Sequence, residues 1–377
     1  MIKVLVVDDS ALVRKLFGRV LTDQSEFEVE VSFARDGLEA LAQLESFRPD
    51  VITLDVNMPQ MNGLECLDRI MVQRPTPVVM VSTVTDEGAD ATLEALRLGA
   101  VDFVSKPSGA VSLRMESFAP TFIEKIRAAS SAKLRSSSRL RERVRLKTAG
   151  VSAARVRRLG SQSTKVDQET EDDEVAPAGT LGEGLVLVGT STGGPPALEA
   201  LLTALSGSFP WPILVAQHMP AGFTGPLAKR LNGICEIKVV EASSPMPIEP
   251  GCAYIGRGDA DIVVSKRPSG LVVMAVPAKL DYPWHPSTDR LVRSAMEHVP
   301  ATQLIGILMT GMGNDGAQAM TELRGKGGRT IAEAEETAVV WGMPGELVRA
   351  GGADWVVPVQ NIAARLQKLV PHHAAHS

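Results

Sequence analysis

The sequence feature that most restricts the fold of this chain is the stretch 185–196, Leu-Val-Leu-Val-Gly-Thr-Ser-Thr-Gly-Gly-Pro-Pro. Its first four residues are apolar without polar alternation, which is typical of a parallel strand covered on both faces. Either proline suits the first turn of a helix, because the N–H that proline lacks has no intrahelical partner there. The stretch therefore predicts a buried strand, a tight turn and a helix, with Ser191 at the carboxyl end of the strand.

A serine at this place has three interpretations, and the stretch alone leaves them open. In open α/β sheets ligands bind at the carboxyl ends of the strands, so Ser191 is a candidate nucleophile. The free N–H groups of the following helix would then stabilise an oxyanion. Alternatively, Ser191 or Thr192 only caps that helix. The third interpretation is a nest of backbone N–H groups that binds a phosphate.

Length, charge and cysteine content narrow the class of protein. The chain has 377 residues, which is enough for two domains and a linker. Its net charge of −5 gives no general basic surface, so we expect no nucleic-acid partner. Cys66, Cys235 and Cys252 lie without metal-site spacing, which indicates a reducing compartment. With no leader pattern and no apolar run of membrane-spanning length, we expect a cytoplasmic protein that is not embedded in a membrane.

Residues 1–125 alternate between strand-like and helical patterns, which predicts a first α/β domain with a parallel, doubly wound sheet. The predicted strands cover residues 4–7, 29–33, 51–54, 78–81 and 102–104. The predicted helices cover residues 11–21, 37–45, 63–74, 85–99 and 121–129. Chemistry in such a domain is expected at the carboxyl ends of the strands.

Acidic residues follow two of these strands. Asp8 and Asp9 end the first strand, and Asp55 ends the third. Three carboxylates at neighbouring strand ends repel one another unless a hard cation joins them, so we expect a Mg²⁺ site. Lys106 and the hydroxyl of Ser82 also follow strands and could reach the same edge. Taken singly, each residue has an ordinary explanation as a turn former, a cap or a solvated charge.

The first domain resembles the receiver domain of response regulators, and the resemblance rests on Asp8-Asp9, Asp55-Val-Asn57-Met58-Pro59, Gly63, Ser82 and Lys106-Pro107. It implies a flavodoxin-like fold in which Asp55 accepts a phosphoryl group from a sensor histidine kinase. It also implies a set of Mg²⁺ ligands: Asp9, Asp55 and the backbone carbonyl of Asn57, with Asp8 assisting. The residues that would respond to the phosphoryl group are Lys106, Ser82 and Phe103, the last of which matches the aromatic switch position.

Residues 126–180 predict a flexible charged linker, because apolar residues are sparse and aromatic residues are absent. Its first half carries a run of arginines and lysines, and its second half contains the acidic sequence 169–174. A short helix near residues 140–146 is one option. A contact between the basic half and nucleic acid or an acidic partner is the alternative to a simple solvated linker.

Residues 181–370 predict a second α/β domain with a doubly wound, mainly parallel sheet and a small antiparallel patch. After the first strand, we expect strands at 213–216, 237–240, 303–309, 329–332 and 355–357. The patch is predicted at 253–255, 261–264 and 271–276, with a hairpin at 268–270. The expected helices cover 197–205, 223–231, 288–298, 317–326 and 362–369, and a turn is expected at 342–344.

Three polar residues of this domain, Ser191, His218 and Asp315, each follow a predicted buried strand. A nucleophile, a base and an orienting carboxylate on adjacent strand ends form the geometry of acyl transfer. The base must be uncharged to take the serine proton, and the carboxylate fixes its tautomer. Considered alone, His218 is better explained as a packed or surface histidine, and Asp315 by the ordinary turn sequence Asn-Asp-Gly.

The second domain resembles the protein-glutamate methylesterase domain of the CheB family, and the resemblance rests on residues 189–194, 217–220, 222–224, 310–316 and 342–344. It implies a catalytic triad of Ser191, His218 and Asp315. Thr192 matches a position beside the nucleophile, and the backbone N–H of Met312 matches an oxyanion contributor. The implied reaction is phosphorylation-activated hydrolysis of γ-glutamyl methyl esters, with deamidation of receptor glutamines as a second activity and without a cofactor.

The resemblance implies two partners, the cytoplasmic helices of methyl-accepting chemotaxis receptors and a CheA-type histidine kinase. By charge alone, Arg230 and Arg257 are candidates to guide an acidic substrate. The sequence departs from the family at 254–259 and 284–289, which affects the expected substrate cleft and not the triad. Residues 371–377 are expected to form a disordered tail in spite of their histidines.

Two other classes of function remain to be weighed. A binding-only response regulator in a chemosensory pathway is the main alternative, although an intact Ser191, His218 and Asp315 argues against it. A DNA-binding regulator would need a helix-turn-helix pattern after the receiver domain, and the sequence contains none. For the enzyme, we expect the unphosphorylated receiver domain to cover the cleft near Ser191 and phosphorylated Asp55 to loosen that contact.

Overall fold

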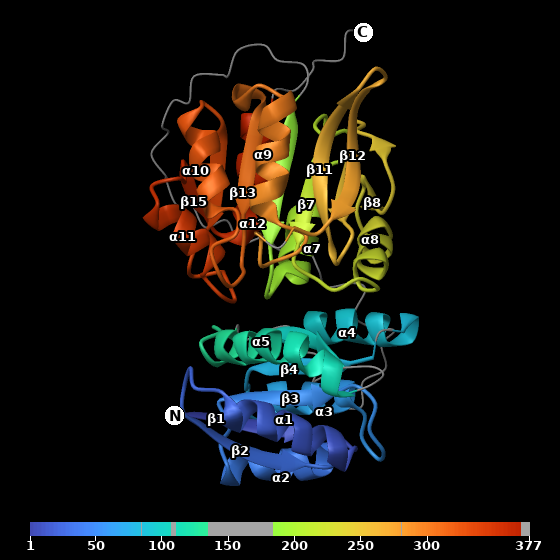
Figure 1. Cartoon of the computed structure of the whole chain (residues 1–377), viewed down its shortest axis with the longest axis vertical. Coiled ribbons are helices and arrows are strands. Elements are labelled where there is room, and N and C mark those ends of the chain that lie inside the picture. The colour runs from blue at the N-terminus through green and yellow to red at the C-terminus, as the bar shows by residue number, and fades with distance from the viewer. Residues whose placement is uncertain (84, 107–110, 135–183, 280, 371–377) are drawn as a thin grey trace, which may run out of the picture.

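The computed structural model describes residues 1–83, 85–106, 111–134, 184–279 and 281–370, and for residues 86 and 111–117 it describes the backbone alone. The chain forms two α/β domains, which lie one above the other in Figure 1. Pro107, most of the linker expected at 126–180 and the tail at 371–377 lie outside the described residues.

The first domain is built on a five-stranded parallel sheet in the order β2-β1-β3-β4-β5. Its strands are β1 (Ile2–Val7), β2 (Val29–Ala34), β3 (Val51–Asp55), β4 (Val78–Ser82) and β5 (Asp102–Ser105). This strand order is that of the flavodoxin-like fold, so the predicted fold class is confirmed. The order also brings the carboxyl ends of β1 and β3, with their aspartates, side by side.

Five helices cover the two faces of this sheet: α1 (Ala11–Asp23), α2 (Gly37–Ser46), α3 (Gly63–Gln73), α4 (Asp86–Leu98) and α5 (Val111–Ser130). On one face, Phe17 of α1 and Phe122 of α5 pack together with ring centroids 4.7 Å apart. On the other face, α2, α3 and α4 pack on the sheet through Leu44, Leu67 and Leu96, which belong to a second apolar core.

Helix α5 begins at Val111, well before the predicted start at residue 121. Pro120 therefore lies inside the helix, where proline removes a backbone hydrogen bond. Phe118 and Phe122 flank this proline, and both rings pack against Phe17, at 5.3 and 4.7 Å. Tertiary packing therefore outweighs the local cost of the proline.

The second domain contains a seven-stranded parallel sheet in the order β15-β14-β13-β6-β7-β10-β8. Its strands are β6 (Leu185–Thr190), β7 (Ile213–Gln217), β8 (Lys238–Ala242), β10 (Cys252–Gly256), β13 (Leu304–Leu308), β14 (Arg329–Glu333) and β15 (Trp355–Val357). The chain turns to opposite sides of β6 when it builds β7 and β13. A ligand site is expected where the strand order reverses in this way.

Helices α7 (Gly194–Leu202), α8 (Thr224–Asn232) and α12 (Val359–Leu369) cover one face of this sheet, and α9 (Thr288–His298), α10 (Ala317–Gly325) and α11 (Met343–Arg349) cover the other. In β6, Val186 and Val188 belong to the core beneath α7, α8 and α12, whereas Leu185 and Leu187 belong to the core beneath α9, α10 and α11. Successive strand residues point to opposite faces, so the apolar run 185–188 reflects burial on both sides.

A separate three-stranded antiparallel sheet consists of β9 (Met246–Pro247), β11 (Ala260–Arg267) and β12 (Gly270–Pro277). The pairing of Arg267 with Gly270 confirms the predicted hairpin. The assignment of residues 253–255 to this patch was wrong, because β10 pairs in parallel with β7 and β8 in the main sheet. All five residues of β10 are buried, as a strand covered on both faces requires.

Three further predictions in the second domain were wrong in detail. The turn expected at 342–344 is the start of α11, with Pro344 in its first turn, where proline costs the helix no hydrogen bond. Helix α12 begins at Val359 rather than at residue 362. Gln303, the first residue of the strand expected at 303–309, instead ends a short 3₁₀ turn, η2 (Ala301–Gln303), and β13 begins at Leu304.

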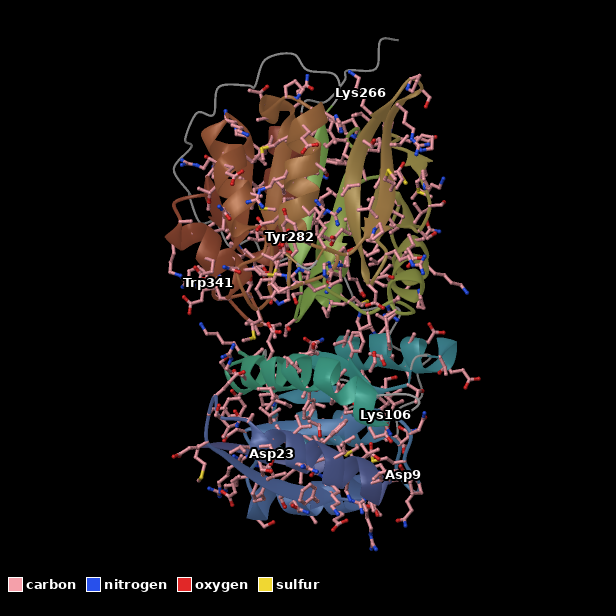
Figure 2. The ribbon with its side chains drawn as sticks, viewed as in Figure 1. Asp9, Asp23, Lys106, Lys266, Tyr282 and Trp341 are labelled. Atoms are coloured by element: carbon pink, nitrogen blue, oxygen red, sulfur yellow. The ribbon has the colours of Figure 1, made fainter. Side chains whose placement is uncertain are left out.

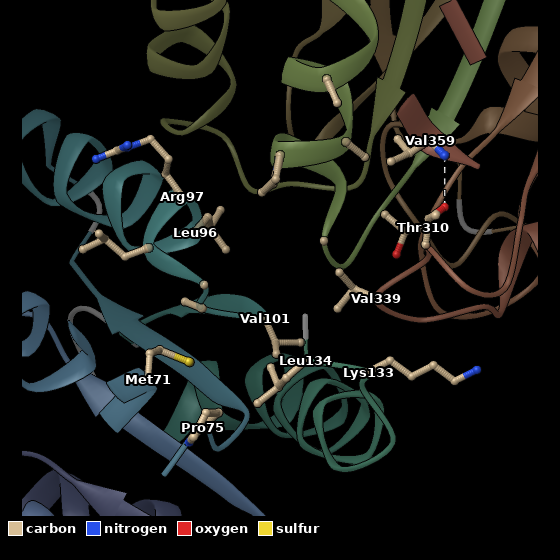
Figure 3. A pocket seen from close by; sticks show the side chains of 18 of the residues that line it. Met71, Pro75, Leu96, Arg97, Val101, Lys133, Leu134, Thr310, Val339 and Val359 are labelled. Atoms are coloured by element: carbon tan, nitrogen blue, oxygen red, sulfur yellow. Dashed lines mark hydrogen bonds between the residues drawn. The ribbon is translucent and has the colours of Figure 1, made fainter. Parts of the chain in front are cut away.

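The face of the receiver domain formed by α4, β5 and α5 lies against the second domain (Figure 1). The rings of Phe103 and Phe223 meet across the boundary at 4.5 Å, and Lys133 pairs with Glu335 at 2.8 Å. A mainly apolar cavity also lies between the domains, with Leu96, Val101 and Leu134 on the receiver side and Val339 and Val359 opposite them (Figure 3).

Gly189 of β6 lies where a side chain would meet helix α9, and this generates a prediction. A Cβ at this position would overlap Thr288 and lie 2.8 Å from Leu308 Cδ1. We expect Gly189→Ala to lower the free energy of unfolding by about 1–3 kcal/mol, because the packed site cannot take the methyl group. Urea unfolding of the full chain measures this. Gly325→Ala is the matched control, since nothing lies within 4 Å of that position, and equal midpoints for the two variants would contradict the account.

Candidate active site and phosphorylation site

The three residues of the predicted triad follow three adjacent strands. Ser191 follows β6, His218 follows β7, and Asp315 lies in the loop between β13 and α10. β6 is paired in parallel with β7 on one side and with β13 on the other. The carboxyl ends of the three strands therefore bring these side chains to one edge of the sheet.

Two glycines shape the turn after Ser191. Gly193 has φ = 76°, in the left-handed region, and a Cβ on Gly194 would overlap the side-chain amide of Gln217. Gly193 is the N-cap of α7, and no side chain hydrogen-bonds to that cap. The alternative in which Ser191 or Thr192 caps the helix is therefore wrong.

His218 and Asp315 form a buried pair. His218 Nε2 lies 2.8 Å from Asp315 Oδ2, and the two side chains are 7% and 4% exposed. The carboxylate therefore favours the tautomer with the proton on Nε2, which leaves Nδ1 as the ring nitrogen that can accept a proton. Nδ1 is buried and has no hydrogen-bond partner among the described residues.

The Asp315 carboxylate has three more donors, all from the first turn of α9. Ser287 Oγ donates at 2.9 Å, and the backbone N–H groups of Thr288 and Asp289 donate at 2.6 and 3.0 Å. Burial by itself would raise the pKa of Asp315, but the hydrogen bond and charge of His218 and these N–H groups outweigh it and lower the pKa below its ordinary value. The carboxylate is thus held in its charged form beside the histidine.

Sequence reasoning missed this turn as part of the site. The segment 284–289 stood out only as a departure from the family pattern, and Asp315 lies far from it in the chain. The available signal was Ser287, a typical N-cap directly before the helical pattern at 288–298. That signal predicts where the helix begins, but it does not predict which carboxylate accepts hydrogen bonds from the first turn.

Ser191 and His218 line a cavity of about 690 Å³ between the two domains. Trp284 also lines it, with its ring stacked on His218 at 6.1 Å between centroids. The receiver side contributes Phe103 and Lys106, so one cavity connects Ser191 with the receiver domain. No hydrogen bond in the described part of the chain joins Ser191 Oγ to His218.

Thr192 and Met312 also lie at this cavity. Thr192 is buried, and its hydroxyl donates to Asp102 Oδ2 of the receiver domain at 2.5 Å. A Cβ on Gly311 would lie 2.8 Å from Ser191 Cβ, so the loop that carries Met312 passes directly beside the nucleophile. The role of the Met312 N–H as an oxyanion donor stays a prediction.

The two arginines considered as substrate guides lie elsewhere. Arg230 and Arg257 are absent from the described residues that line this cavity. Arg230 lies 3.7 Å from Glu94 and 3.8 Å from Glu199, so it belongs to the contact between the domains. Arg257 is exposed.

The acidic residues of the receiver domain meet as predicted. Ligand atoms of Asp8, Asp9 and Asp55 lie within 4.8 Å of one another. Lys106 Nζ lies 2.7 Å from Asp55 Oδ2 and 2.9 Å from Asp8 Oδ2, and in Figure 2 Lys106 and Asp9 lie on the same side of the domain. Burial raises the pKa of Asp55 to about 6, although Lys106 and the backbone N–H of Asn57 lower it.

This donor set fits a magnesium ion. All three side-chain ligands are carboxylates, and Asp9 is exposed, which leaves room for the water molecules that Mg²⁺ retains. Asp8, Asp9 and Asp55 would hold the ion, which would screen their mutual repulsion and the charge of an incoming phosphoryl group. A contribution from the backbone carbonyl of Asn57 stays a prediction.

The two remaining switch residues differ in their present contacts. Ser82 Oγ donates to the carbonyl of Gly88 at 3.1 Å, so it would have to turn to reach a phosphoryl group on Asp55. Phe103 is 2% exposed and lies between Phe223 and the ammonium group of Lys125. It therefore already links β5 to the second domain.

The position of Lys106 predicts an effect on metal affinity. Its ammonium group lies within ion-pair distance of two of the predicted Mg²⁺ ligands, Asp55 and Asp8. Lys106→Met should therefore strengthen Mg²⁺ binding at least about tenfold by removing a like charge at close range. Isothermal titration calorimetry at pH 8, well above the pKa of Asp55 of about 6, measures the affinity with the carboxylates ionised. Lys3→Met, which removes a lysine paired with Glu30, should leave it unchanged. Weaker binding by Lys106→Met would contradict this placement.

Comparison with known proteins agrees with both halves of the structure. Residues 4–116 match the response regulator receiver domain family, and residues 186–366 match the CheB methylesterase family. The crystal structure of the Thermotoga maritima CheB methylesterase catalytic domain is 35% identical and covers 50% of this chain and 100% of that chain, with a TM-score of 0.49.

Full-length relatives extend the match to nearly the whole chain. Protein-glutamate methylesterase/protein-glutamine glutaminase 2 of Rhodopseudomonas palustris is 54% identical over 97% of this chain and 97% of its own length. Protein-glutamate methylesterase/protein-glutamine glutaminase 3 of Rhodospirillum rubrum is 51% identical over 97% of this chain and 95% of its own length. The chain therefore belongs to the CheB methylesterase family, with a response regulator receiver domain at its N-terminus.

Proposed function

We propose that this protein hydrolyses γ-glutamyl methyl esters on chemoreceptors and deamidates receptor glutamines, under the control of receiver phosphorylation. The observation that carries the proposal is the buried His218–Asp315 pair, which shares one cavity with Ser191. The names of the relatives supply the substrate class. Both reactions break an acyl bond of a glutamyl side chain, so one site serves both.

In the first half of the reaction, Ser191 Oγ attacks the ester carbonyl carbon while His218 Nδ1 takes the hydroxyl proton. Asp315 stabilises the imidazolium that forms, through Nε2. The carbon–oxygen bond to the methoxy group then breaks, and His218 returns the proton to that oxygen, which releases methanol. The N–H groups at the start of α7 and of Met312 are the proposed donors to the oxyanion.

In the second half, a water molecule attacks the acyl-enzyme and gives a proton to His218. The bond between the acyl carbon and Ser191 Oγ breaks, the proton returns to Oγ, and a glutamate side chain is released. With a glutamine substrate the same steps release ammonia in place of methanol. No cofactor enters either half, and the Mg²⁺ at the receiver domain would serve phosphorylation alone.

We also propose that the unphosphorylated receiver domain restrains this site through β5 and α5. Asp102 accepts a hydrogen bond from the hydroxyl of Thr192, the neighbour of the nucleophile, and Glu124 accepts one from the indole N–H of Trp284 at 3.2 Å. Lys106 bonds to Asp55 and lines the same cavity as Ser191. A phosphoryl group on Asp55 would draw Lys106 and Ser82 toward its oxygens, and β5 would move with them.

The proposed partners follow from the two halves of the molecule. A CheA-type histidine kinase would supply the phosphoryl group, and the cytoplasmic helices of chemoreceptors would supply the ester, so we place the reaction in the cytoplasm. None of the helices in the described part of the chain combines the length and the apolar character that a membrane crossing requires. A binding-only regulator remains the alternative that the activity test decides.

The direct test is methanol release from methylated receptor membranes by the full chain. We expect wild type to release methanol, and Mg²⁺ with acetyl phosphate to increase the rate severalfold. Ser191→Ala should lose about 10³-fold or more, because the nucleophile is gone. Asp55→Asn is the control for the switch and should keep the basal rate without the increase. Equal rates for wild type and Ser191→Ala would contradict the enzyme and favour a docking regulator.

A further inference from the structure

Asp261, in β11 of the antiparallel sheet, is a fully buried carboxylate that the proposed reaction does not use. Its Oδ1 accepts the backbone N–H of Ser287 at 2.8 Å and lies 2.9 Å from His285 Nδ1. Its Oδ2 accepts from Arg290 Nη1 at 2.5 Å. The three partners surround the first turn of α9, at residues 285, 287 and 290.

That turn is the one that holds the triad carboxylate. Ser287 lies between the two acidic groups: its backbone N–H donates to Asp261, and its hydroxyl donates to Asp315. The same hydroxyl also accepts the N–H of Arg290 as the helix cap, at 3.3 Å. The orientation of Ser287 Oγ is therefore fixed from both sides, by the cap and by Asp261.

We propose that Asp261 and Ser287 are positioning residues for the catalytic carboxylate, acting in the order Asp261, Ser287, Asp315 and His218. Asp261 fixes the backbone of the turn, and the turn then fixes both oxygens of Asp315. As far as it concerns catalysis, this inference rests on the proposed function. It also gives the antiparallel sheet a function, because β11 carries Asp261 to the turn that holds Asp315.

The physical reason is that the buried hydrogen bond between Asp315 and His218 tolerates little displacement. Asp315 must keep one oxygen on His218 Nε2, and a shift of about 1 Å in its position costs a large part of the rate. Backbone N–H groups at a helix start hold a carboxylate only where the helix itself is held. A buried charge such as Asp261 stays in place because it is fully paired, here by Arg290 and by Ser287 N–H.

A merely structural role is the competing explanation, and α9 offers a matched control. Ser294 Oγ, on the same helix, accepts the N–H of Val264 in the same strand β11, at 3.0 Å, and donates to Leu291 O at 2.9 Å. Within the described residues, these two bonds of Ser294 Oγ do not involve Asp315. Ser294→Ala therefore loosens α9 against β11 without changing a donor of the triad carboxylate.

The kinetic test compares Ser287→Ala, Asp261→Asn and Ser294→Ala in the full chain, with methanol release from methylated receptor membranes as the readout. We expect the first two variants to lower kcat about tenfold with KM unchanged, and Ser294→Ala to keep both. In an Asp315→Ala background, Ser287→Ala should cause no further loss, because the carboxylate it positions is absent. An equal loss in both backgrounds would overturn the proposal.

A second measurement is independent of any substrate. In protein labelled with ¹⁵N-histidine, the low-field proton on His218 Nε2 reports its hydrogen bond to Asp315, and its loss in His218→Gln assigns it. We expect this resonance to move upfield in Ser287→Ala and Asp261→Asn, and to stay in Ser294→Ala. An unmoved resonance in both variants overturns the positioning role. A moved resonance in a protein that releases no methanol would instead support the positioning role and reject the proposed activity.

Discussion

The charged state of Asp315 is the constraint on which the catalytic half of this molecule depends. A buried carboxylate is expensive unless its oxygens are paired, and here a histidine, a serine hydroxyl and two backbone N–H groups pair them. Pairing the carboxylate in this way requires the ends of β13 and β7 and the start of α9 to lie close together. The central position of β6 follows, because it places Ser191 between the strands that carry the other two residues.

The receiver domain also depends on the pairing of acidic groups, since three neighbouring carboxylates lie around one lysine. β5 and the residue that follows it connect this acidic cluster to the second domain. Asp102 bonds to Thr192, Phe103 packs on Phe223, and Lys106 bonds to Asp55. A change of charge at Asp55 therefore acts on a strand that already contacts the neighbour of the nucleophile. At this point the interface combines a polar contact, Asp102 with Thr192, and an apolar one, Phe103 with Phe223.

Much of this architecture could be predicted from the sequence, because parallel strands and chemistry at strand ends leave clear local patterns. The strands before Ser191, His218 and Asp55 are of this kind. The parallel pairing of β10 could not be predicted, since a short apolar run does not reveal its partner strand. The support of Asp315 by Ser287 and Asp261 is likewise a product of tertiary contacts between distant segments. The same holds for Pro120, which aromatic packing keeps inside α5.

The most direct test of the central claim, that the receiver domain closes the cleft over Ser191, is amide hydrogen exchange of the full chain. Peptides that cover residues 102–106, 190–193 and 284–290 should exchange faster when Mg²⁺ and acetyl phosphate are added, because the contact between the domains opens. The same peptides of Asp55→Asn should not respond. Unchanged exchange in phosphorylated wild type, with Asp55 shown to be modified by mass spectrometry, would contradict the account.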